Sequence, residues 1–376
     1  MTKPTSYTKE IFIYKSCDNV SEYHAMLHVT DCTLTFDKQL DELCDMYKSM
    51  MNNELKDASP LFVRYFMSDA ANQEAKVKEC AKELHFCATS IIEQPPLDGT
   101  KVAMWVYAVD SASARAIDDN TFVYEHGGYR HLWSGSMSTV GNGSRTQTRT
   151  LFENYIDILK KEQCTLADNC MRTWFYVRDI DINYSGVVDG RNEVFACNGL
   201  TKESHSISST GIGGRNADKE RPVQMDAYSI AGIDKEQIRF LYAPTHLNPT
   251  HEYGVSFERG TCIEYGDRRH VIISGTASID NKGAVVHVGD IRRQTMRMWE
   301  NVEVLLKEAD CDYGNVGQMI VYLRDIADFH TVKKMYDERF PETPKVFLLA
   351  PVCRPEWLIE MECIAIKATK NNYNKF

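Results

Sequence analysis

The stretch Tyr322-Leu323-Arg324-Asp325, with a glutamine before it and a methionine after it, decides the fold because the same arrangement occurs three times. Each copy has a glutamine that opens a predicted helix, an aromatic residue three positions before an aspartate, and an apolar strand around a methionine. The intervals are 30, 32 and 31 residues from glutamine to aspartate, then 35, 46 and 36 to methionine. The residues are Gln39, Phe66, Asp69 and Met104; Gln147, Tyr176, Asp179 and Met225; Gln294, Tyr322, Asp325 and Met361. Such periods are too long for a solenoid, so each copy is predicted to be a small domain.

The third copy gives the clearest order of elements. His270–Ser278 (HVIISGTAS) has a strand pattern that breaks at Gly275, and the turn at 281–283 predicts a partner strand over Val285–Val288. Apolar residues at helical spacing predict a helix over Ile291–Ala309. The later elements are a strand at Asn315–Leu323, a helix at Ala327–Phe340 stopped by Pro341, and strands at Val346–Leu349 and Leu358–Ile366. The order is β-β-α-β-α-β-β.

The other two copies repeat parts of this order. The second has strands at His131–Ser138, Met171–Val177 and Val223–Ile230, a helix at Thr146–Glu162 and a Gly/Ser-rich stretch at Ser204–Gly214. The first has helices at Phe36–Asn52 and Gln73–Leu84 and strands at Leu61–Met67 and Val102–Val109. The predicted domains are a degenerate repeat at 1–115, a second repeat at 116–232, a long ordered connecting loop at 233–267 and a third repeat at 268–376.

A sheet with helices on one face leaves its other face to be buried. The prediction is therefore an α+β fold in which three repeats pack their open faces together as an intramolecular pseudo-trimer. Three internal copies remove the need for a homotrimer, so a monomer or a weak homo-oligomer is expected.

Composition excludes several classes of protein. An apolar fraction of 43% in 376 residues is ordinary for a globular protein. The net charge is −10 and there is no run of five basic residues, which disfavours nucleic-acid binding. The polar stretch at residues 1–15 is not expected to act as a secretory signal, and no apolar stretch approaches the about 20 residues that span a bilayer. A cytoplasmic protein without a membrane partner is expected.

The twelve cysteines predict neither a metal site nor a disulfide framework, because no CxxC pair occurs. Several lie in apolar segments, where reduced cysteines behave as small buried hydrophobic residues: Cys44, Cys80, Cys87, Cys170 and Cys363. The close histidine pair, His24 and His28, lacks the glutamate of an HExxH motif. No metal and no organic cofactor is predicted.

One carboxylate stands out in the last predicted strand. Glu360 and Glu362 point to the same face of a strand over Leu358–Ile366. On the inner side of a sheet a carboxyl group can have a raised pKa and donate a proton near neutral pH. The second copy has Gln224 at the position of Glu360, and the first has Ala103, so only the third copy keeps an ionisable group. The alternative is an exposed edge strand with ordinary surface glutamates.

Other candidates suit the binding of a small carboxylate. The turn Ser274-Gly275-Thr276-Ala277 brings backbone and hydroxyl groups close to a ligand, although a strand bulge without a ligand would look the same. Arginine binds carboxylates with two parallel hydrogen bonds, and Arg354, Arg191 and Arg259 are the candidates. A surface ion pair is the alternative for each arginine.

The third copy resembles the RidA superfamily. The matching segments are Ile273-Ser274-Gly275, Gly289-Asp290-Ile291 with Gln294, Tyr322 to Asp325 with Phe329, and Ile359 to Glu362. Imine deaminases of that superfamily carry an arginine just after the proline that opens the penultimate strand. Here that position falls on Val346, which argues against deamination.

A longer part of the chain, about residues 60 to 366, resembles the chorismatases. The matching segments are Trp174-Phe175-Tyr176, Gly190-Arg191, Ser209 to Gly213, Tyr253-Gly254 with Phe257 and Arg259, and Val352-Cys353-Arg354 through Glu360. The resemblance implies that Glu360 is the proton donor and that arginines hold the two carboxylates of chorismate. Glu360 and Arg354 are the implied catalytic residues, and substrate contacts fall to Arg191, Tyr176, Cys353, Arg259 and the Ser274–Ala277 turn.

The leading hypothesis is a chorismatase-like enzyme that cleaves the enolpyruvyl ether of chorismate, or of a related small dicarboxylate, and releases pyruvate. One alternative is a non-enzymatic RidA-like protein that binds small carboxylates. Another is a RidA-type enamine or imine deaminase, which Val346 weakens. Older names for the superfamily refer to ribonuclease L-PSP and to inhibition of translation initiation, and the acidic composition supports neither activity.

Overall fold

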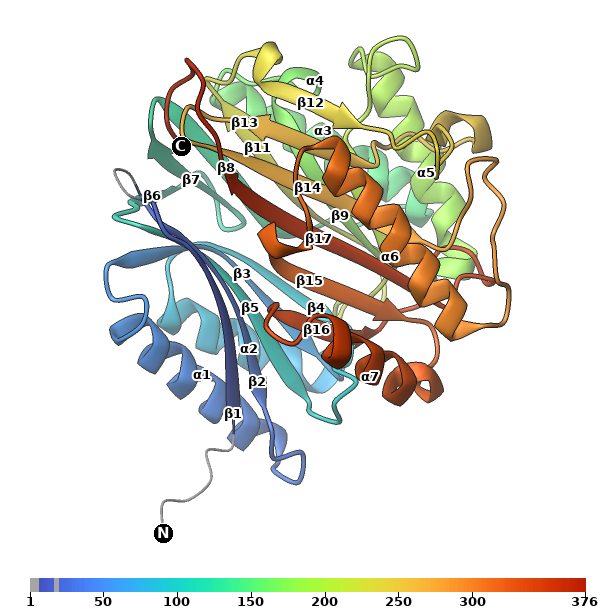
Figure 1. The fold of residues 1–376 in the computed structure, drawn as a ribbon. Coiled ribbons are helices and arrows are strands. Elements are labelled where there is room, and N and C mark those ends of the chain that lie inside the picture. Colours follow the sequence, from blue (N-terminus) through green and yellow to red (C-terminus); the bar gives the residue numbers. More distant parts are fainter. Residues whose placement is uncertain (1–6, 17–19) are drawn as a thin grey trace.

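Three sheets of mixed strand direction follow one another along the chain in the computed structural model, which describes residues 7–16 and 20–376 (Figure 1). The first copy contains β1 (Tyr7–Tyr14), β2 (Glu22–Val29), α1 (Phe36–Asn52), β3 (Ala58–Met67), α2 (Ala70–Leu84), β4 (Ala88–Glu93) and β5 (Val102–Asp110). The second contains β6 (Ala114–Ala116), β7 (Thr121–His126), β8 (Tyr129–Ser138), α3 (Gly143–Lys161), α4 (Leu166–Asn169), β9 (Cys170–Val177), α5 (Ile180–Cys197), β10 (Ser208–Gly213) and β11 (Val223–Ala231). The third contains β12 (Ile238–Leu241), β13 (Gly260–Glu264), β14 (Arg268–Ala277), α6 (Ile291–Glu308), β15 (Val316–Leu323), α7 (Phe329–Arg339), β16 (Lys345–Leu349) and β17 (Ile359–Ala368).

The three sheets share one topology. Their strand orders are β1-β2-β5-β3-β4, β7-β8-β11-β9-β10 and β13-β14-β17-β15-β16, with β6 and β12 added at the edge of the second and third sheets. In chain order each copy reads β-β-α-β-α-β-β, with the penultimate strand parallel to its neighbour and the others antiparallel. The predicted α+β class and the three-repeat pseudo-trimer are confirmed.

A buried glutamine makes the same two hydrogen bonds in each copy. Its side-chain NH₂ donates to a carbonyl in the loop before the first helix, and its side-chain oxygen accepts a backbone N–H at the start of the last strand. The contacts are Gln39 with Leu34 O (3.0 Å) and Lys101 N (2.7 Å), Gln147 with Gly141 O (3.1 Å) and Val223 N (3.4 Å), and Gln294 with His287 O (3.2 Å) and Leu358 N (2.9 Å). The repeated glutamine therefore ties the first helix to the last strand of its own copy.

The repeated aspartate marks the entry to the second helix of each copy. Asp69 and Asp179 are the N-cap residues of α2 and α5, and Asp325 caps the short turn that precedes α7. The side chain of Asp325 accepts a hydrogen bond from the backbone N–H of Ala327 at 2.9 Å, which satisfies a free helical donor.

The three copies are arranged as a ring. Their helices lie on its outside, and the open faces of the three sheets meet at its axis (Figure 1). The ring of Phe62 in the first copy packs on Trp133 of the second at 5.0 Å between centroids. Glu22 of the first copy pairs with Arg268 and His270 of the third at 2.7 and 2.9 Å. Aromatic and ionic contacts between copies therefore bury the sheet face that would be exposed to solvent in an isolated copy.

We call the junction between neighbouring copies a seam. In the first seam β4 lies against β8, and Ile91 N–H donates to Ser136 Oγ at 2.8 Å. In the second, β10 lies against β14, and Ser209 N–H donates to Ser274 Oγ at 3.0 Å. In the third, β16 lies close to β2, where His28 Nε2 is 3.1 Å from Lys345 O.

Two sequence predictions of secondary structure were wrong, and one strand was missed. Residues 285–288 form no strand, and Val285 makes only an isolated bridge to Ile279. The antiparallel partner of β14 is instead β13, which precedes it and lies with β12 inside the predicted connecting loop at 233–267. The Gly/Ser-rich stretch at 204–214 contains β10, an edge strand. The strand β10 is hard to recognise because polar residues such as Ser209 and Thr210 make contacts with the third copy.

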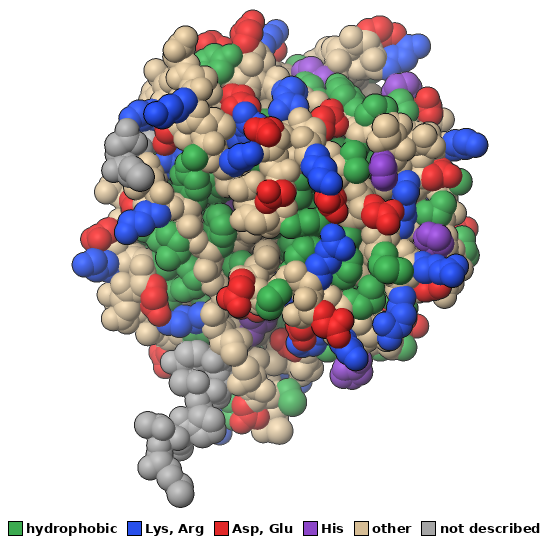
Figure 2. Space-filling model, viewed as in Figure 1, with side chains coloured by type: hydrophobic (Ala, Val, Ile, Leu, Met, Phe, Trp, Pro, Cys, Tyr) green, Lys and Arg blue, Asp and Glu red, His purple; other side chains and the backbone are tan. Residues whose placement is uncertain are grey.

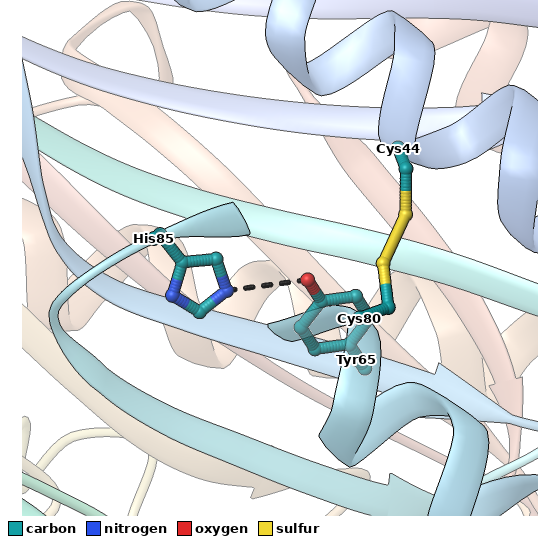
Figure 3. Close-up of a disulfide and its surroundings, with 4 residues drawn as sticks. All are labelled: Cys44, Tyr65, Cys80 and His85. Atoms are coloured by element: carbon teal, nitrogen blue, oxygen red, sulfur yellow. Dashed lines mark hydrogen bonds between the residues drawn. A yellow bond between two sulfur atoms is a disulfide. The ribbon is translucent and has the colours of Figure 1, made fainter. Parts of the chain in front are cut away.

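Two cysteines predicted to be thiols are joined by a disulfide, as Figure 3 shows. Cys44 of α1 and Cys80 of α2 link the two helices of the first copy on the outer face of its sheet. Nearby, Tyr65 Oη and His85 Nε2 are 3.2 Å apart (Figure 3). Cys87, Cys170 and Cys363 are buried thiols, as predicted.

The face shown in Figure 2 carries acidic and basic side chains intermixed, without a broad area of one sign. Among the described helices none is long and apolar enough to cross a membrane.

Candidate active site

A cavity of about 290 Å³ lies in the second seam. The second copy contributes α5 and β10, and the third contributes the bulged end of β14, the start of β17 and the segments 254–259 and 353–357. Its walls combine aromatic, arginine and carboxyl side chains, with small residues where the two copies approach most closely. A concave, partly apolar site with a few convergent polar groups is typical of a small-molecule site.

Glu360 lies at the start of β17 and reaches into this cavity, and the residue is only 5% exposed. It is placed opposite Ala277 of β14 and Tyr322 of β15 in the sheet register. The register between β14 and β17 shifts between Ile273 and Thr276, which is a β-bulge. This bulge turns the backbone at 274–275 toward the carboxyl group.

Gly275 makes room for that carboxyl group. A Cβ atom at residue 275 would lie 2.1 Å from Glu360 Oε1 and 2.9 Å from its carboxyl carbon. It would also lie 3.0 Å from Thr210 Cγ2, so the space is closed by the neighbouring copy as well. Any side chain at this position would displace Glu360, which explains why the bulge carries a glycine.

Burial raises the pKa of Glu360 to about 8, the charge of Glu362 adds to the rise, and Arg172 and Arg259 oppose it. Glu362 accepts hydrogen bonds from Arg172 Nη2 and Trp174 Nε1 at 2.7 Å each, and from the hydroxyl of Thr210. These donors compensate the charge of Glu362, whereas no described residue donates a hydrogen bond to Glu360. The carboxyl group of Glu360 therefore keeps its proton at neutral pH.

Thr210 of β10 joins the two copies beside this pair. Its hydroxyl donates to Glu362 and accepts the backbone N–H of Gly275 at 2.9 Å. Ser274 makes a parallel link, because its hydroxyl accepts from Ser209 N–H and donates to Glu258 O at 2.6 Å. The position of the bulge, and so of Glu360, depends on the second copy as much as on the third.

Three arginines line the cavity together with Glu360. Arg191 comes from α5 and is buried. Arg259 is also buried, where its Nη2 donates to Asn248 O at 3.1 Å and its guanidinium lies over the ring of Phe257 at 5.2 Å. Arg354 is partly exposed and lies over the ring of Trp357 at 4.7 Å. Aromatic stacking orients planar guanidinium groups, which suits them to a carboxylate ligand.

Most of the predicted site residues meet at this cavity. Its walls include Glu360, Arg354, Arg191, Arg259, Gly275, Ala277 and Cys353. The remaining three predicted contacts lie outside the lining. Tyr176 points to the ring axis, where its hydroxyl donates to Asp226 at 3.2 Å. Ser274 links β10 to Glu258, which precedes β13, and Thr276 donates to the carbonyl of Ser274 at 2.9 Å.

The sequence predictions missed Tyr184 and Trp357, whose rings line the cavity. A signal for Tyr184 was present, because Tyr184, Val188 and Arg191 recur at helical spacing and therefore share one face of α5. A Cβ at Gly211 would lie 2.5 Å from the ring of Tyr184, so the glycine of β10 accommodates it. Recognising α5 from the sequence would have brought Arg191 and Tyr184 together.

No group of three or more His, Cys, Asp or Glu side chains in the described ranges is arranged to hold a metal ion.

Comparisons with known proteins agree with this architecture. The family model described as Endoribonuclease L-PSP matches residues 262–367. A RutC family protein of Pyrococcus abyssi is 35% identical over 99 residues, which are 26% of this chain and 78% of that protein. The 3-aminoacrylate deaminase RutC of Acinetobacter baylyi is 32% identical over 97 residues, which are 25% of this chain and 77% of that protein.

A likeness to a solved structure extends to the whole ring. A crystal structure of chorismatase covers 82% of this chain and 93% of its own, with a TM-score of 0.64 and 17% identity. The chain therefore has the fold of chorismatase, with three related domains in one polypeptide. Through its third copy the chain belongs to the RutC family of the RidA superfamily.

Proposed function

We propose that the second-seam cavity is the active site of an enzyme that cleaves the enolpyruvyl ether of chorismate, or of a similar small dicarboxylate, to release pyruvate. One observation carries the proposal: Glu360, a buried acid with a pKa of about 8, faces a cavity lined by three arginines. An acid that is still protonated at neutral pH can serve as a general acid. Paired guanidiniums suit a substrate with two carboxylates.

The reaction begins with transfer of the Glu360 proton to the methylene carbon of the enolpyruvyl group. The former double bond becomes a methyl group beside an oxocarbenium centre, and Glu360 becomes a carboxylate. Water adds to that centre, and its released proton returns to Glu360. The resulting hemiketal collapses by breaking the bond between its carbon and the ring oxygen, which yields pyruvate and the ring alcohol. A ring hydroxyl in place of water would give an internal product.

The arginines have two tasks in this scheme. Arg354 and Arg191 bind the substrate carboxylates, and Arg259 adds positive charge close to Glu360. A guanidinium near the carboxylate of the reacting group also stabilises the anion that Glu360 becomes after proton transfer. The apolar walls at Tyr184 and Trp357 shield the cavity from bulk solvent, which strengthens these electrostatic interactions.

The test is to incubate the purified protein with chorismate and to measure pyruvate by coupling to lactate dehydrogenase. Wild-type protein should release pyruvate, and Glu360→Gln should lower kcat by about a hundredfold or more, the usual contribution of a general acid. Glu356→Gln is the matched control, because Glu356 is exposed and lies four residues away. Equal release by wild type and Glu360→Gln would refute the proposal.

A binding protein without turnover would give a different result in the same experiment. Chorismate would then raise the melting temperature of both wild type and Glu360→Gln, without any pyruvate. Deamination, the activity named for the Acinetobacter relative, is the remaining candidate. It would appear as release of ammonia from an imine faster than in buffer.

A further inference from the structure

The third seam contains a second cavity of about 290 Å³. It lies between β1 and β2 of the first copy and α7 and β16 of the third. These elements correspond in topology to β13, β14, α5 and β10 of the second seam, where β14, α5 and β10 line the cavity of Glu360. The second cavity is therefore the counterpart of the first, related to it by the internal symmetry of the ring.

The ionisable side chain that faces the cavity comes from a different strand in each of the two seams. In the second seam Ala277 of β14 lies opposite Glu360 of β17. In the third seam His28 of β2 lies opposite Ala103 of β5 at the same register position. A titratable side chain thus faces both cavities, but it comes from the other strand of the pair.

His28 lies between two hydrogen-bond acceptors. Its Nε2 donates to the carbonyl of Lys345 at 3.1 Å, since a carbonyl can only accept. Its Nδ1 lies 3.6 Å from Asp98 Oδ2. Asp98 is fixed in turn by the N–H and the hydroxyl of Thr100, at 3.0 and 2.6 Å. The carboxylate of Asp98 is therefore held in place at the rim of the cavity.

A buried lysine supplies positive charge on the opposite copy. Lys345 is 6% exposed, and its Nζ lies 3.6 Å from Glu10 Oε1 and donates to the carbonyls of Phe340 and Thr343. The backbone N–H of Lys345 donates to Glu10 Oε2 at 2.8 Å. At the open side, Lys333 and Asp337 of α7 form an ion pair at 2.5 Å. The cavity wall thus contains both positive and negative side chains.

The apolar part of the wall comes from two phenylalanines. Phe329 of α7 and Phe347 of β16 line the cavity with their rings edge to face, 5.8 Å apart. A ligand with only one kind of charge would meet like charges here, whereas a ligand with both an ammonium and a carboxylate finds partners for each. The rings offer a surface for an apolar side chain.

We propose that the third seam binds a free α-amino acid with an apolar side chain. Asp98 receives its ammonium group, Lys333 binds its carboxylate in place of Asp337, and Phe329 and Phe347 contact its side chain. The cavity volume is close to the lower end of the range of about 300–1,000 Å³ for small-ligand sites, which suits a single amino acid. The inference is independent of the reaction proposed at Glu360.

The test is isothermal titration calorimetry of the full chain with L-leucine, L-methionine and L-phenylalanine at millimolar concentration. At least one should bind with a stoichiometry of one per chain. Its N-acetyl and carboxamide derivatives, which lack the ammonium or the carboxylate, should bind about tenfold more weakly or worse, because each loses a charge-assisted hydrogen bond.

Variants assign the binding to one seam. Asp98→Asn should weaken it by about tenfold, and Glu360→Gln, which alters the other cavity, should not change it. Lys333→Glu changes only an exposed side chain and should weaken binding even if Asp98→Asn does not fold. The proposal is overturned if none of the three amino acids binds, or if binding is lost in Glu360→Gln and retained in Asp98→Asn or Lys333→Glu.

Discussion

The first and second seams are built from the same strands, yet they differ at one pair of side chains. Both have a bulge in the strand that meets the neighbouring copy, at Ser136 in β8 and at Gly275 in β14. Both hold an inner carboxylate with several donors, Asp226 in the first seam and Glu362 in the second. The difference lies two residues before this carboxylate on the last strand, where the first seam has Gln224 and the second has Glu360.

In the first seam the amide of Gln224 donates to the carbonyl of Ile91 at 3.1 Å, and Ser136 Oγ accepts the N–H of the same residue. Side chains thus join the neighbouring strand directly. In the second seam Gly275 has no side chain to accept an N–H, although its own N–H donates to Thr210 of the neighbouring strand, and Glu360 faces a cavity instead. The comparison teaches that an acid persists where the edge of the next copy leaves space for a ligand, whereas an amide suits the closed seam.

The largest effect is expected from Gly275→Ala. The new Cβ would lie 2.1 Å from Glu360 Oε1, so the acid must move away from its place in the cavity. Pyruvate release from chorismate should fall about a thousandfold, within the usual contribution of a general acid. Ser136→Ala, at the same position of the first seam, is the matched control and should leave the rate unchanged. A Gly275→Ala protein that folds and retains full activity would break the comparison.

The next effect tests the closed seam with Gln224→Glu. A carboxylate facing the carbonyl of Ile91 without a ligand cavity should destabilise the protein by about 3 kcal/mol at neutral pH. Acidic solution should reduce this loss, because a protonated carboxyl group can donate to that carbonyl. Urea unfolding at both pH values measures it, with Gln224→Met as the uncharged control. An equal loss at the two pH values would contradict the explanation.

The pH dependence of the second seam follows from the pKa of about 8 for Glu360. If its protonated form is the active one, kcat/KM should be level below that pH and fall about tenfold per unit above it. The folded protein also keeps a proton that the unfolded chain releases above the ordinary value of 4.5, so stability falls as pH rises from 4.5 to about 8.

Glu360→Gln removes both dependences, which makes it the reference for each measurement. Plotted against pH, the free energies of unfolding of wild type and Glu360→Gln should diverge as pH increases through this window and run parallel above it. If the two plots stay parallel from acid to alkaline pH, the pKa of Glu360 is not raised in the folded protein.

The smallest effect concerns Ser136→Ala in the first seam. The variant removes the acceptor of the Ile91 N–H, and the backbone of Ser136 has φ of +54°, which remains strained with alanine. Loss of one buried hydrogen bond should lower the free energy of unfolding by about 1 kcal/mol. Chemical denaturation measures this difference, and a change in pyruvate release would show that the first seam also affects the reaction.

The repeated glutamine and aspartate made the fold predictable, because each has a fixed local task in its own copy. Gln294 can be recognised from sequence since its partners, His287 and Leu358, belong to one domain. The first two strands of the first copy were missed for the opposite reason. Glu22 and His24 of β2 are buried polar residues on a strand, and the partners of Glu22, Arg268 and His270, lie in the third copy.

The candidate site was predictable to the same degree. Comparing the three copies singled out Glu360, because an acid replaces Gln224 and Ala103, and the cavity does surround it. The role of Thr210 was not visible, because a hydroxyl in a Gly/Ser-rich stretch gives no pattern until β10 is placed against β14. Thr276 lies on β14, which lines the site with Gly275 and Ala277, yet the alternation of side chains along the strand turns Thr276 away from it. Tyr176 lies on β9, which is outside the lining of the site.

The three copies are joined by peptide bonds, and this has a consequence for assembly. A ring of three separate chains forms at a rate and to an extent set by their concentration, and it dissociates on dilution. Here each copy meets its neighbours at the high effective concentration that a covalent tether provides. Dilution therefore cannot take the ring apart, and the specific activity should be the same at nanomolar and micromolar protein.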